Sequence, residues 1–513
     1  MLPKHLVSWL IVPLLLVASL DAVSAADPLI EAVKKGDKAA VRILLQKRGD
    51  VTGAEADGTT ALHWAVQRDD SETVDLLIRA GGNVKAVNRY GVTPLGLASV
   101  NGNAATIEML LKAGADPNTA LPGGETALMT AARTGKADAL NVLMAHGADV
   151  NVKESTRGQT ALMWAAAEGN VEAIKALIAH GGDMKARERG GWTAMLFAVR
   201  AGRFDAVRAL LAAGGDVNEA LVSTGGGRGR GADAGAGVGA GPGRRGGAGQ
   251  GGGSSAMLVA VTNAHYEIAS FLLDKGADPN AAGQGWTALH EITSLRKPGQ
   301  TAGPGPKGSG NIDSVEFIRR LVAHGANVNA RATRRPNISG PTALNLIGAT
   351  PFLMAARTGD ARLMRLLVEL GADPSLPNED GTTPLLAAAG VGTASPGEDA
   401  GLEPDCLEAV KVALELGNDV NAVDKNGNTA MHGAAFKQLP SVVAFLAEKG
   451  AKIEIWNRKN TSGWTPLRIA VGLHRGMNFR FSEPTADALR QVMTAASVST
   501  EVEPEAVISG ATK

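Results

Sequence analysis

Residues 58–91 read GTTALHWAVQRDDSETVDLLIRAGGNVKAVNRYG. Thr60 belongs to the residue types that cap a helix by accepting a backbone N–H bond. Leu62, Ala65 and Val66 follow it at helical spacing and give the helix one apolar edge. The segment is therefore predicted to open with a short, capped helix.

The second half of the same segment predicts a second helix over residues 72–80, with Val74, Leu77 and Ile78 facing inward. Gly81 then provides the left-handed conformation in which many helices end. The Gly-Asn-rich stretch that follows has the composition of a turn. The whole segment is thus predicted to be one helix–helix–turn unit.

Two markers repeat this unit along the chain with a basic period of 33 residues. The first marker is a step of Thr or Ser, then Ala or Pro, then a residue like Leu or Met, which starts at Thr60, Thr93, Thr126, Thr160, Thr193, Ser255, Thr287, Thr350, Thr383, Thr429 and Thr465. The glycines that close the second helices are Gly49, Gly81, Gly114, Gly147, Gly181, Gly214, Gly276, Gly325, Gly371, Gly417 and Gly450. Because the two markers keep one register, the chain is predicted to be an array of repeats that begins at Asp27.

The units resemble the ankyrin repeat, whose pattern is a turn, Thr-Pro-Leu-His, two helices and Gly-Ala-Asp. Residues 60–63 (TALH) and 114–118 (GADPN) carry the resemblance, which extends over about residues 27–483. Ala replaces Pro in many units, and the motif histidine is present only at His63, His290 and His432. The resemblance implies an all-α solenoid of about 11–12 helix-turn-helix units with finger loops, in which each unit is stabilised by its neighbours.

The N-terminus has the three parts of a secretory signal peptide. Lys4 is followed by an apolar run over residues 6–20, and small residues stand at 23–25. We expect residues 1–25 to be removed by cleavage after Ala25 or Ala26, which predicts a periplasmic or secreted protein. The apolar run is shorter than the roughly 20 residues of a membrane span. Retention as an anchor stays open, and no later stretch is predicted to span a membrane.

Insertions divide the array. The predicted organisation is a signal peptide (1–25), repeats 1–6 (26–219), a Gly-rich disordered insert (220–254), repeats 7–12 (255–483) with inserts at 297–310, 331–349 and 390–404, a capping helix (484–496) and a flexible tail (497–513).

Charge and motifs argue against several classes of function. The 51 basic and 51 acidic residues balance, so no global field steers the chain to nucleic acid or an acidic membrane. His290 and Glu291 begin like a zinc-protease motif, but Ser294 replaces the second histidine. Neither a phosphate-binding loop nor a Gly-x-Ser-x-Gly elbow is present. No cofactor, metal site or catalytic residue is predicted, although a dispersed Ser/His/Asp set stays open.

The resemblance implies that fingers and first helices form a concave groove for a protein partner. Trp64 and Trp164 are expected in the core, whereas Trp192 and Trp286 are equally compatible with partner contacts and with wedges between fingers. The candidate contact residues are Arg89, Tyr90, Arg187, Arg189, Trp192, Trp286, Arg331, Arg334, Asn378 and Lys425.

The function predicted from the sequence is a monomeric, non-catalytic scaffold for an exported or periplasmic protein whose identity the sequence does not reveal. A secreted effector that engages a host protein is the first alternative. A hydrolase with its site in an insert loop is the second.

Overall fold

The computed structural model describes residues 27–222, 253–299, 305–335, 342–475 and 478–502. The predicted signal peptide, most of the predicted Gly-rich insert and the last part of the predicted tail lie outside the described residues.

Twelve helix pairs follow one another along the described residues. The first helices are α1 (Pro28–Lys35), α3 (Ala61–Gln67), α5 (Pro94–Asn101), α7 (Ala127–Thr134), α9 (Ala161–Glu168), α11 (Ala194–Arg200), α13 (Ala256–Thr262), α15 (Ala288–Arg296), α17 (Pro351–Arg357), α19 (Pro384–Ala388), α21 (Ala430–Lys437) and α24 (Pro466–Val471). The second helices are α2 (Lys38–Gln46), α4 (Ser71–Arg79), α6 (Ala104–Lys112), α8 (Ala137–Ala145), α10 (Val171–Ala179), α12 (Phe204–Ala212), α14 (Tyr266–Asp274), α16 (Ser314–Ala323), α18 (Ala361–Glu369), α20 (Glu403–Glu415), α22 (Pro440–Glu448) and α25 (Glu483–Ala495). The predicted helical solenoid is confirmed.

The repeated motif builds each unit in the way the sequence predicts. Thr160, for example, accepts a hydrogen bond from the backbone N–H of Met163 and so caps α9. At the end of α4, Gly81 has a φ of 93°, and its N–H donates to the carbonyl of Ile78 at 3.0 Å. A left-handed glycine therefore turns the chain from the helix pair into the next finger.

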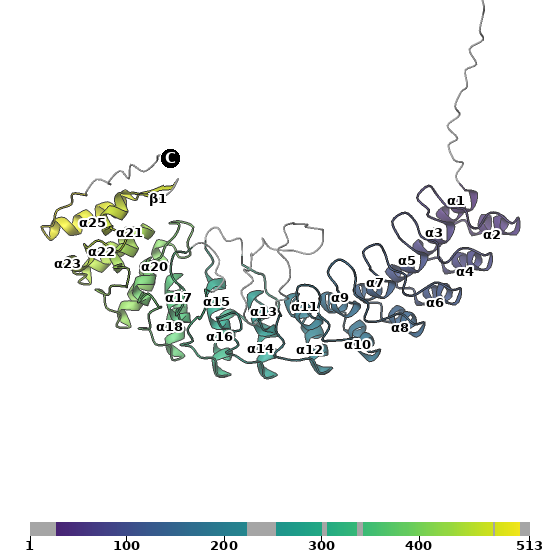
Figure 1. The fold of residues 1–513 in the computed structure, drawn as a ribbon, viewed down its shortest axis with the longest axis horizontal. Helices are drawn as coiled ribbons and strands as arrows, with labels where there is room; N and C mark the ends of the chain where they lie inside the picture. Colours follow the sequence, from purple (N-terminus) through teal and green to yellow (C-terminus); the bar gives the residue numbers. More distant parts are fainter. Residues whose placement is uncertain (1–26, 223–252, 300–304, 336–341, 476–477, 503–513) are drawn as a thin grey trace, which may run out of the picture.

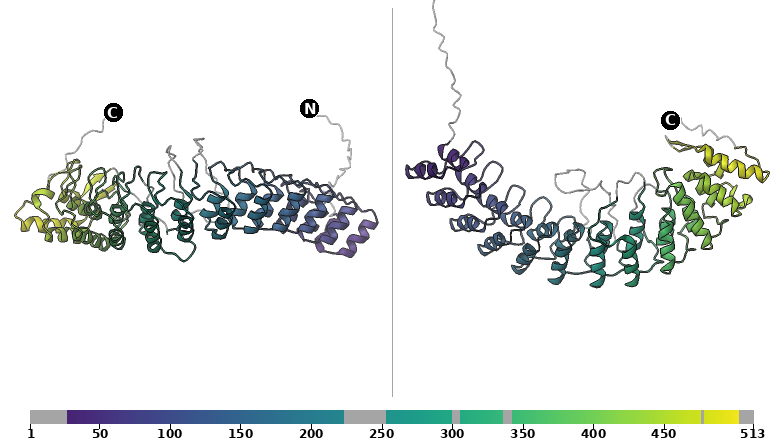
Figure 2. Two further views of the ribbon diagram at one scale, coloured as in Figure 1. Left: turned by 90° about the horizontal axis from the view of Figure 1, so that it is seen from below. Right: turned by 180° about the vertical axis from the view of Figure 1, so that it is seen from behind.

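The pairs stack into one curved row, in which each first helix packs on the next first helix and nearly every second helix packs on the next second helix; α16 and α18 are the exception. The first helices and the fingers line the inner, concave side of the arc, and the second helices line its outer side (Figures 1 and 2). We call the two sets inner and outer helices and number the pairs as units 1 to 12.

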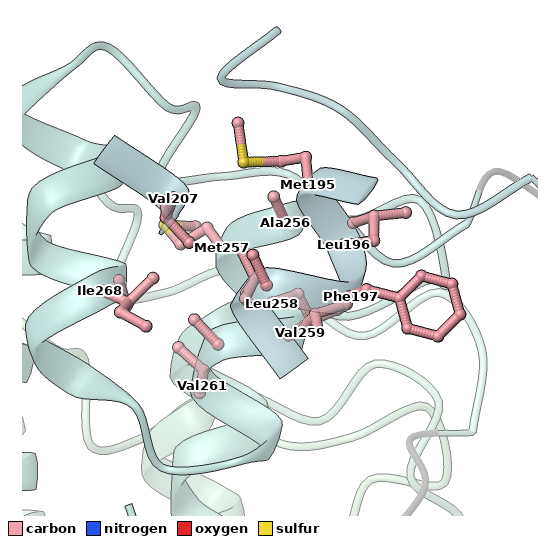
Figure 3. Close-up of a cluster of buried hydrophobic side chains, with 14 of the residues drawn as sticks. Met195, Leu196, Phe197, Val207, Ala256, Met257, Leu258, Val259, Val261 and Ile268 are labelled. Carbon is pink, nitrogen blue, oxygen red and sulfur yellow. The ribbon is translucent and has the colours of Figure 1, made fainter. Parts of the chain in front are cut away.

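The core continues across the boundary between units 6 and 7. Leu196 and Val199 of α11 and Leu258 and Val261 of α13 are buried, and α11 packs directly on α13 (Figure 3). A backbone bridge between Ala220 and Ser255 closes the base of the finger there. The long insert therefore leaves the stacking of units 6 and 7 intact.

An asparagine at the end of many units fixes the next unit in register. Asn118 donates from Nδ2 to the carbonyl of Gly147 at 3.0 Å and accepts the N–H of Asp149 at 2.8 Å. The same pair of contacts recurs one or more units later at Asn151, Asn280, Asn329 and Asn421. Each clamp satisfies backbone groups of the following turn, which ties loop to loop along the outer edge of the row.

The C-terminal end departs from the plain repeat. A four-residue helix α23 (Ile453–Trp456) lies in the last finger, and β1 (Leu473–Arg475) pairs antiparallel with β2 (Asn478–Arg480) before α25 begins. The hairpin is absent from the all-α interpretation of the sequence. Helix α25 packs on α22 and α24 and takes the position of the twelfth outer helix.

None of the helices in the described ranges has the length and apolar character needed to cross a bilayer. The longest of them, α20 and α25, have 13 residues each, about 20 Å at 1.5 Å per residue.

Candidate interaction surface

The open face of each inner helix is narrow. In α9, Leu162, Met163 and Ala166 are buried against the neighbouring helices, whereas Trp164 is half-buried and Glu168 is exposed. Outer helices cover one side of α9 and adjacent inner helices cover two more, so the remaining face is the concave one. Side chains at the position of Trp164 therefore line the groove.

Aromatic rings and cations alternate along the groove of units 1 to 6. Lys34 lies 4.8 Å from the ring centre of Trp64, and Arg133 lies 5.4 Å from that of Trp164. Arg200 lies 4.6 Å from the ring centre of Trp192 and 5.1 Å from that of Phe197. Each contact is within the range of a cation–π interaction. We define the aromatic–cation stripe as Lys34, Trp64, Arg133, Trp164, Trp192, Phe197 and Arg200.

The indole N–H groups of the stripe differ in their hydrogen bonding. The Trp64 indole N–H donates to Glu55 at 2.7 Å, whereas the buried Nε1 of Trp164 has no hydrogen-bond partner. A buried donor without an acceptor costs about 1–3 kcal/mol relative to a satisfied one. The N–H of Trp164 is closed off from solvent, so only the rest of its half-buried ring faces the groove.

Arg89 and Tyr90 stand at a fingertip, as predicted. Both side chains are exposed, Tyr90 by 59%. The guanidinium of Arg89 donates to the hydroxyl of Tyr90 at 2.6 Å and lies 4.8 Å from the centre of its ring. The pair forms a stiff, amphipathic tip suited to contact a partner.

Arg187 and Arg189 occupy another finger and play different parts. Arg187 is half-buried; it donates to the carbonyls of Gly191 and Ala220 and lies 3.5 Å from Glu219. Its guanidinium therefore joins two fingers. Arg189 is exposed and donates to the carbonyl of Thr156 at 2.9 Å.

The two finger tryptophans also differ. Trp192 is half-buried under Arg200 and keeps part of its ring on the groove. Trp286 is only 8% exposed, and its indole N–H donates to Glu291 at 3.0 Å. We therefore correct the candidate surface by removing Trp286, because a buried ring with a satisfied N–H cannot anchor a partner.

Asn378 requires the same correction. It is 4% exposed, accepts the N–H of Thr382 at 2.8 Å and donates to the carbonyl of Asn345 at 2.6 Å. Its side chain builds the finger instead of presenting a contact.

The remaining predicted residues, Arg331, Arg334 and Lys425, are exposed on later fingers. Arg331 donates to the carbonyls of Gly348 and Pro377, and Lys425 to that of Glu379. Arg331 and Lys425 thus brace neighbouring fingers, although both side chains remain exposed.

The family follows from comparison with known proteins. A model of three consecutive ankyrin repeats matches residues 7–88, 29–121, 66–154, 128–220 and 400–478, and the single ankyrin-repeat model matches 252–283 and 347–379. These matches cover more than half of the chain. The chain belongs to the ankyrin-repeat family. Ankyrin repeats indicate a protein-interaction scaffold. The aromatic–cation stripe lies on the concave groove.

Curated ankyrin-repeat relatives are similar over part of their length. SH3 and multiple ankyrin repeat domains protein 2 of Homo sapiens is 28% identical over 221 residues, which is 39% of this chain and 10% of that protein. Ankyrin repeat protein B18 of Vaccinia virus (strain Ankara), like that of Variola virus, is 29% identical over 144 residues, or 26% of this chain and 21% of the viral protein. The chain thus spans about a tenth to a fifth of the length of these relatives.

Ser309 and His265 form a serine–histidine contact of the kind found in catalytic sites. Ser309 Oγ lies 3.0 Å from Nδ1 of His265, beside a hollow of about 370 Å³ that Tyr266 and Arg296 also line. Nε2 of His265 contacts the carbonyl of Arg200 at 3.1 Å. Side chains at the same place in other ankyrin units, such as Asn170, also bond the end of the preceding inner helix. His265 therefore joins neighbouring units, and among the described residues no carboxylate hydrogen-bonds to its ring.

Among the described residues, no group of three or more His, Cys, Asp or Glu side chains is placed to hold a metal ion.

Of the aromatic–cation stripe, only Trp192 was predicted from the sequence as a candidate contact. Trp64 and Trp164 were expected in the core, and Lys34, Arg133, Phe197 and Arg200 were not predicted. Arg133 and Trp164 belong to consecutive ankyrin units, so a pattern read within one unit does not reveal their contact. Aligning the units would have placed a cation near the end of one inner helix beside an aromatic residue in the next.

Proposed function

We propose that the chain is an exported ankyrin scaffold that captures a protein partner in its concave groove, in the periplasm or outside the cell. The aromatic–cation stripe is the observation that carries the binding part of this proposal. Half-buried tryptophans and arginines are the residue types on which binding energy concentrates in protein interfaces. The N-terminal sequence pattern supports the export part.

Binding is tested by chemical cross-linking and affinity capture with a groove variant, Trp164→Ala with Trp192→Ala. The wild type is expected to capture a partner reproducibly, and the variant to recover at least about tenfold less, since loss of an aromatic anchor costs 2 kcal/mol or more. Arg79→Ala with Arg208→Ala, on exposed faces of outer helices, is the matched control and should capture as much as the wild type.

A second variant shows whether lower capture could result from misfolding of the groove variant. Arg89→Ala with Tyr90→Ala changes only exposed fingertip side chains and should lower capture without moving the melting temperature. Full capture by both groove and fingertip variants would refute a concave binding site.

Export is tested separately by N-terminal sequencing of the protein recovered after expression in a bacterium with a periplasm. The expected first residue is Ala26 or Asp27, in protein released with the periplasmic contents. Leu15→Arg interrupts the apolar run and should keep the chain inside the cell. Wild-type protein that stays in the cytosol and starts at Met1 would contradict export while leaving the binding proposal standing.

A further inference from the structure

The positive charges of the aromatic–cation stripe become less compensated from unit 1 to unit 6. Lys34 forms an ion pair of 2.5 Å with Glu55, and Arg133 lies 3.7 Å from Glu125. Arg200 has no carboxylate within ion-pairing distance among the described residues, and only aromatic rings contact its guanidinium. The groove therefore carries its least neutralised charge near unit 6.

A second guanidinium interacts electrostatically with Arg200. Arg157, at the tip of the unit 5 finger, is exposed, and its side chain makes no ion pair within the part of the chain that the structure describes. Burial lowers the pKa of Arg200, and the positive charge of Arg157 lowers it further, whereas the negative charge of Glu188 partly offsets both effects. Like charges that interact in this way destabilise one another, and an anion placed between them would relieve the repulsion.

The carboxylates of this region are already engaged by their own fingers. Glu154 is buried and accepts the backbone N–H groups of Thr156, Arg157 and Gln159. Burial raises the pKa of Glu154, but these hydrogen bonds outweigh it, so that the pKa is below its usual value. Glu188 is also buried and accepts the N–H of Trp192 at 3.1 Å. Neither carboxylate pairs with Arg157 or Arg200.

We propose that an acidic, extended segment of the protein partner lies across units 4 to 6 and places a carboxylate between Arg157 and Arg200. This inference rests on the proposed function and specifies its partner. Guanidinium groups bind carboxylates through paired, charge-assisted hydrogen bonds, and the flat rings beneath them hold the segment's apolar parts.

The spacing of the groove sets the spacing of the acidic residues. Arg133 and Arg200 end inner helices two units apart, and packed helices lie about 8–10 Å from each other. An extended chain advances about 3.3 Å per residue. A second carboxylate at Arg133 would thus stand about five or six residues from the one at Arg200.

A protein segment fits this surface better than a polyanion. Glu125, Glu154 and Glu188 lie among the arginines, so the surface is not uniformly positive. A nucleic acid presents a phosphate at every step and would bring charge next to each of these carboxylates. Discrete acidic side chains avoid that repulsion.

The test is selection of a phage-displayed library of random twelve-residue peptides on the full chain, followed by fluorescence anisotropy with the enriched peptides. We expect enrichment of Asp or Glu at two positions about five or six apart. Arg157→Gln with Arg200→Gln should weaken binding of these peptides at least about tenfold, with an unchanged melting temperature. Arg79→Gln with Arg208→Gln removes two charges from outer helices and should change binding less than about twofold.

Four outcomes would overturn the inference. Enriched peptides without acidic residues, or acidic peptides that bind the double groove variant as well as the wild type, would leave the scaffold function in place but remove the acidic partner. Tighter binding of a single-stranded RNA than of the peptides, lost in the groove variant, would assign the site to a polyanion. A selection without any groove-dependent peptide would count against both the acidic partner and the scaffold.

Discussion

His290 joins two ankyrin units through a ring that solvent does not reach. Its Nδ1 accepts the N–H of Thr287 at 3.2 Å, and its Nε2 lies 3.1 Å from the carbonyl of Ala349 in the next unit. His63 and His432 make the corresponding bonds in their units. Burial lowers the pKa of His290 to about 4, and that of His432 to about 4 as well.

This depressed pKa predicts acid sensitivity in the region of these units. An unfolded histidine titrates near pH 6.5, so the folded state binds fewer protons than the unfolded state between about pH 6.5 and 4. Stability is therefore complete above about pH 6.5 and is lost as the pH falls, by about 1.4 kcal/mol per pH unit for each histidine.

His290→Met isolates the effect, because Met129 and Met163 fill the same place in units 4 and 5. The variant should be less stable than the wild type at pH 7.5 and should lose less stability between pH 7.5 and 4.5, by urea unfolding at several pH values. His432→Met should repeat the pattern in unit 11. Parallel pH profiles for wild type and both variants would show that these rings do not couple folding to pH.

A buried charge cluster beneath the 390–404 insert gives a second prediction. Asp399 is 4% exposed and lies among Arg357 and Lys437, which are also buried. Burial lowers the pKa of Arg357 to about 10, so it remains a cation at neutral pH. Lys437 donates to the carbonyl of Ala400 at 2.5 Å, which fixes the insert to α21.

Asp399→Ala should destabilise the protein by about 1–3 kcal/mol, because the buried cations Arg357 and Lys437 would lose the attraction of this carboxylate. The neighbouring exposed Glu398→Ala is the control and should change stability by less than about 0.5 kcal/mol. If chemical denaturation shows equally small losses of stability for Asp399→Ala and Glu398→Ala, the charge cluster is solvated.

At the residue scale, the sequence predicts the structural role of those side chains whose contacts lie within one unit. The caps at Thr60 and Thr160 and the glycine at 81 were predicted because propensity and position decide them locally. Trp286 and Asn378 were misjudged because burial of a finger side chain depends on the adjacent finger. The stacking of Arg133 on Trp164 was missed for the same reason.

At the scale of elements, the helix pairs were predictable, whereas the C-terminal hairpin was not. Residues 473–480 lack the alternation of apolar and polar residues that marks a strand, and the pairing of β1 with β2 follows from the short link between them. Helix α25 was predicted from its cap, Ser482, and its apolar spacing, and its Leu489 is fully buried.

Leu489→Ala should loosen only the end of the row. The change leaves a cavity between α22, α24 and α25 and should cost about 2–5 kcal/mol. Because units contact only their neighbours, hydrogen exchange should quicken in these helices and stay unchanged in α3 to α10. The exposed Gln491→Ala serves as the control. Faster exchange throughout the chain would indicate a single cooperative core.

At the scale of the whole molecule, the concave groove exists because the units lie in a row. Repeats with a shared register bury their apolar faces against one another, and the Asn118-type clamps fix the order in which they stack. The sequence predicted this row from its period. It did not predict which part of the inner surface is aromatic and basic, since that depends on contacts between units.

The described units form an open, curved row instead of a closed globule. Small-angle X-ray scattering of the chain that begins at Asp27 tests it directly. The row predicts a radius of gyration well above the roughly 24 Å of a compact chain of this length, with a distance distribution that peaks at the thickness of the row and extends in a long tail. A radius near 24 Å with a symmetric, bell-shaped distribution would contradict the row and the groove that depends on it.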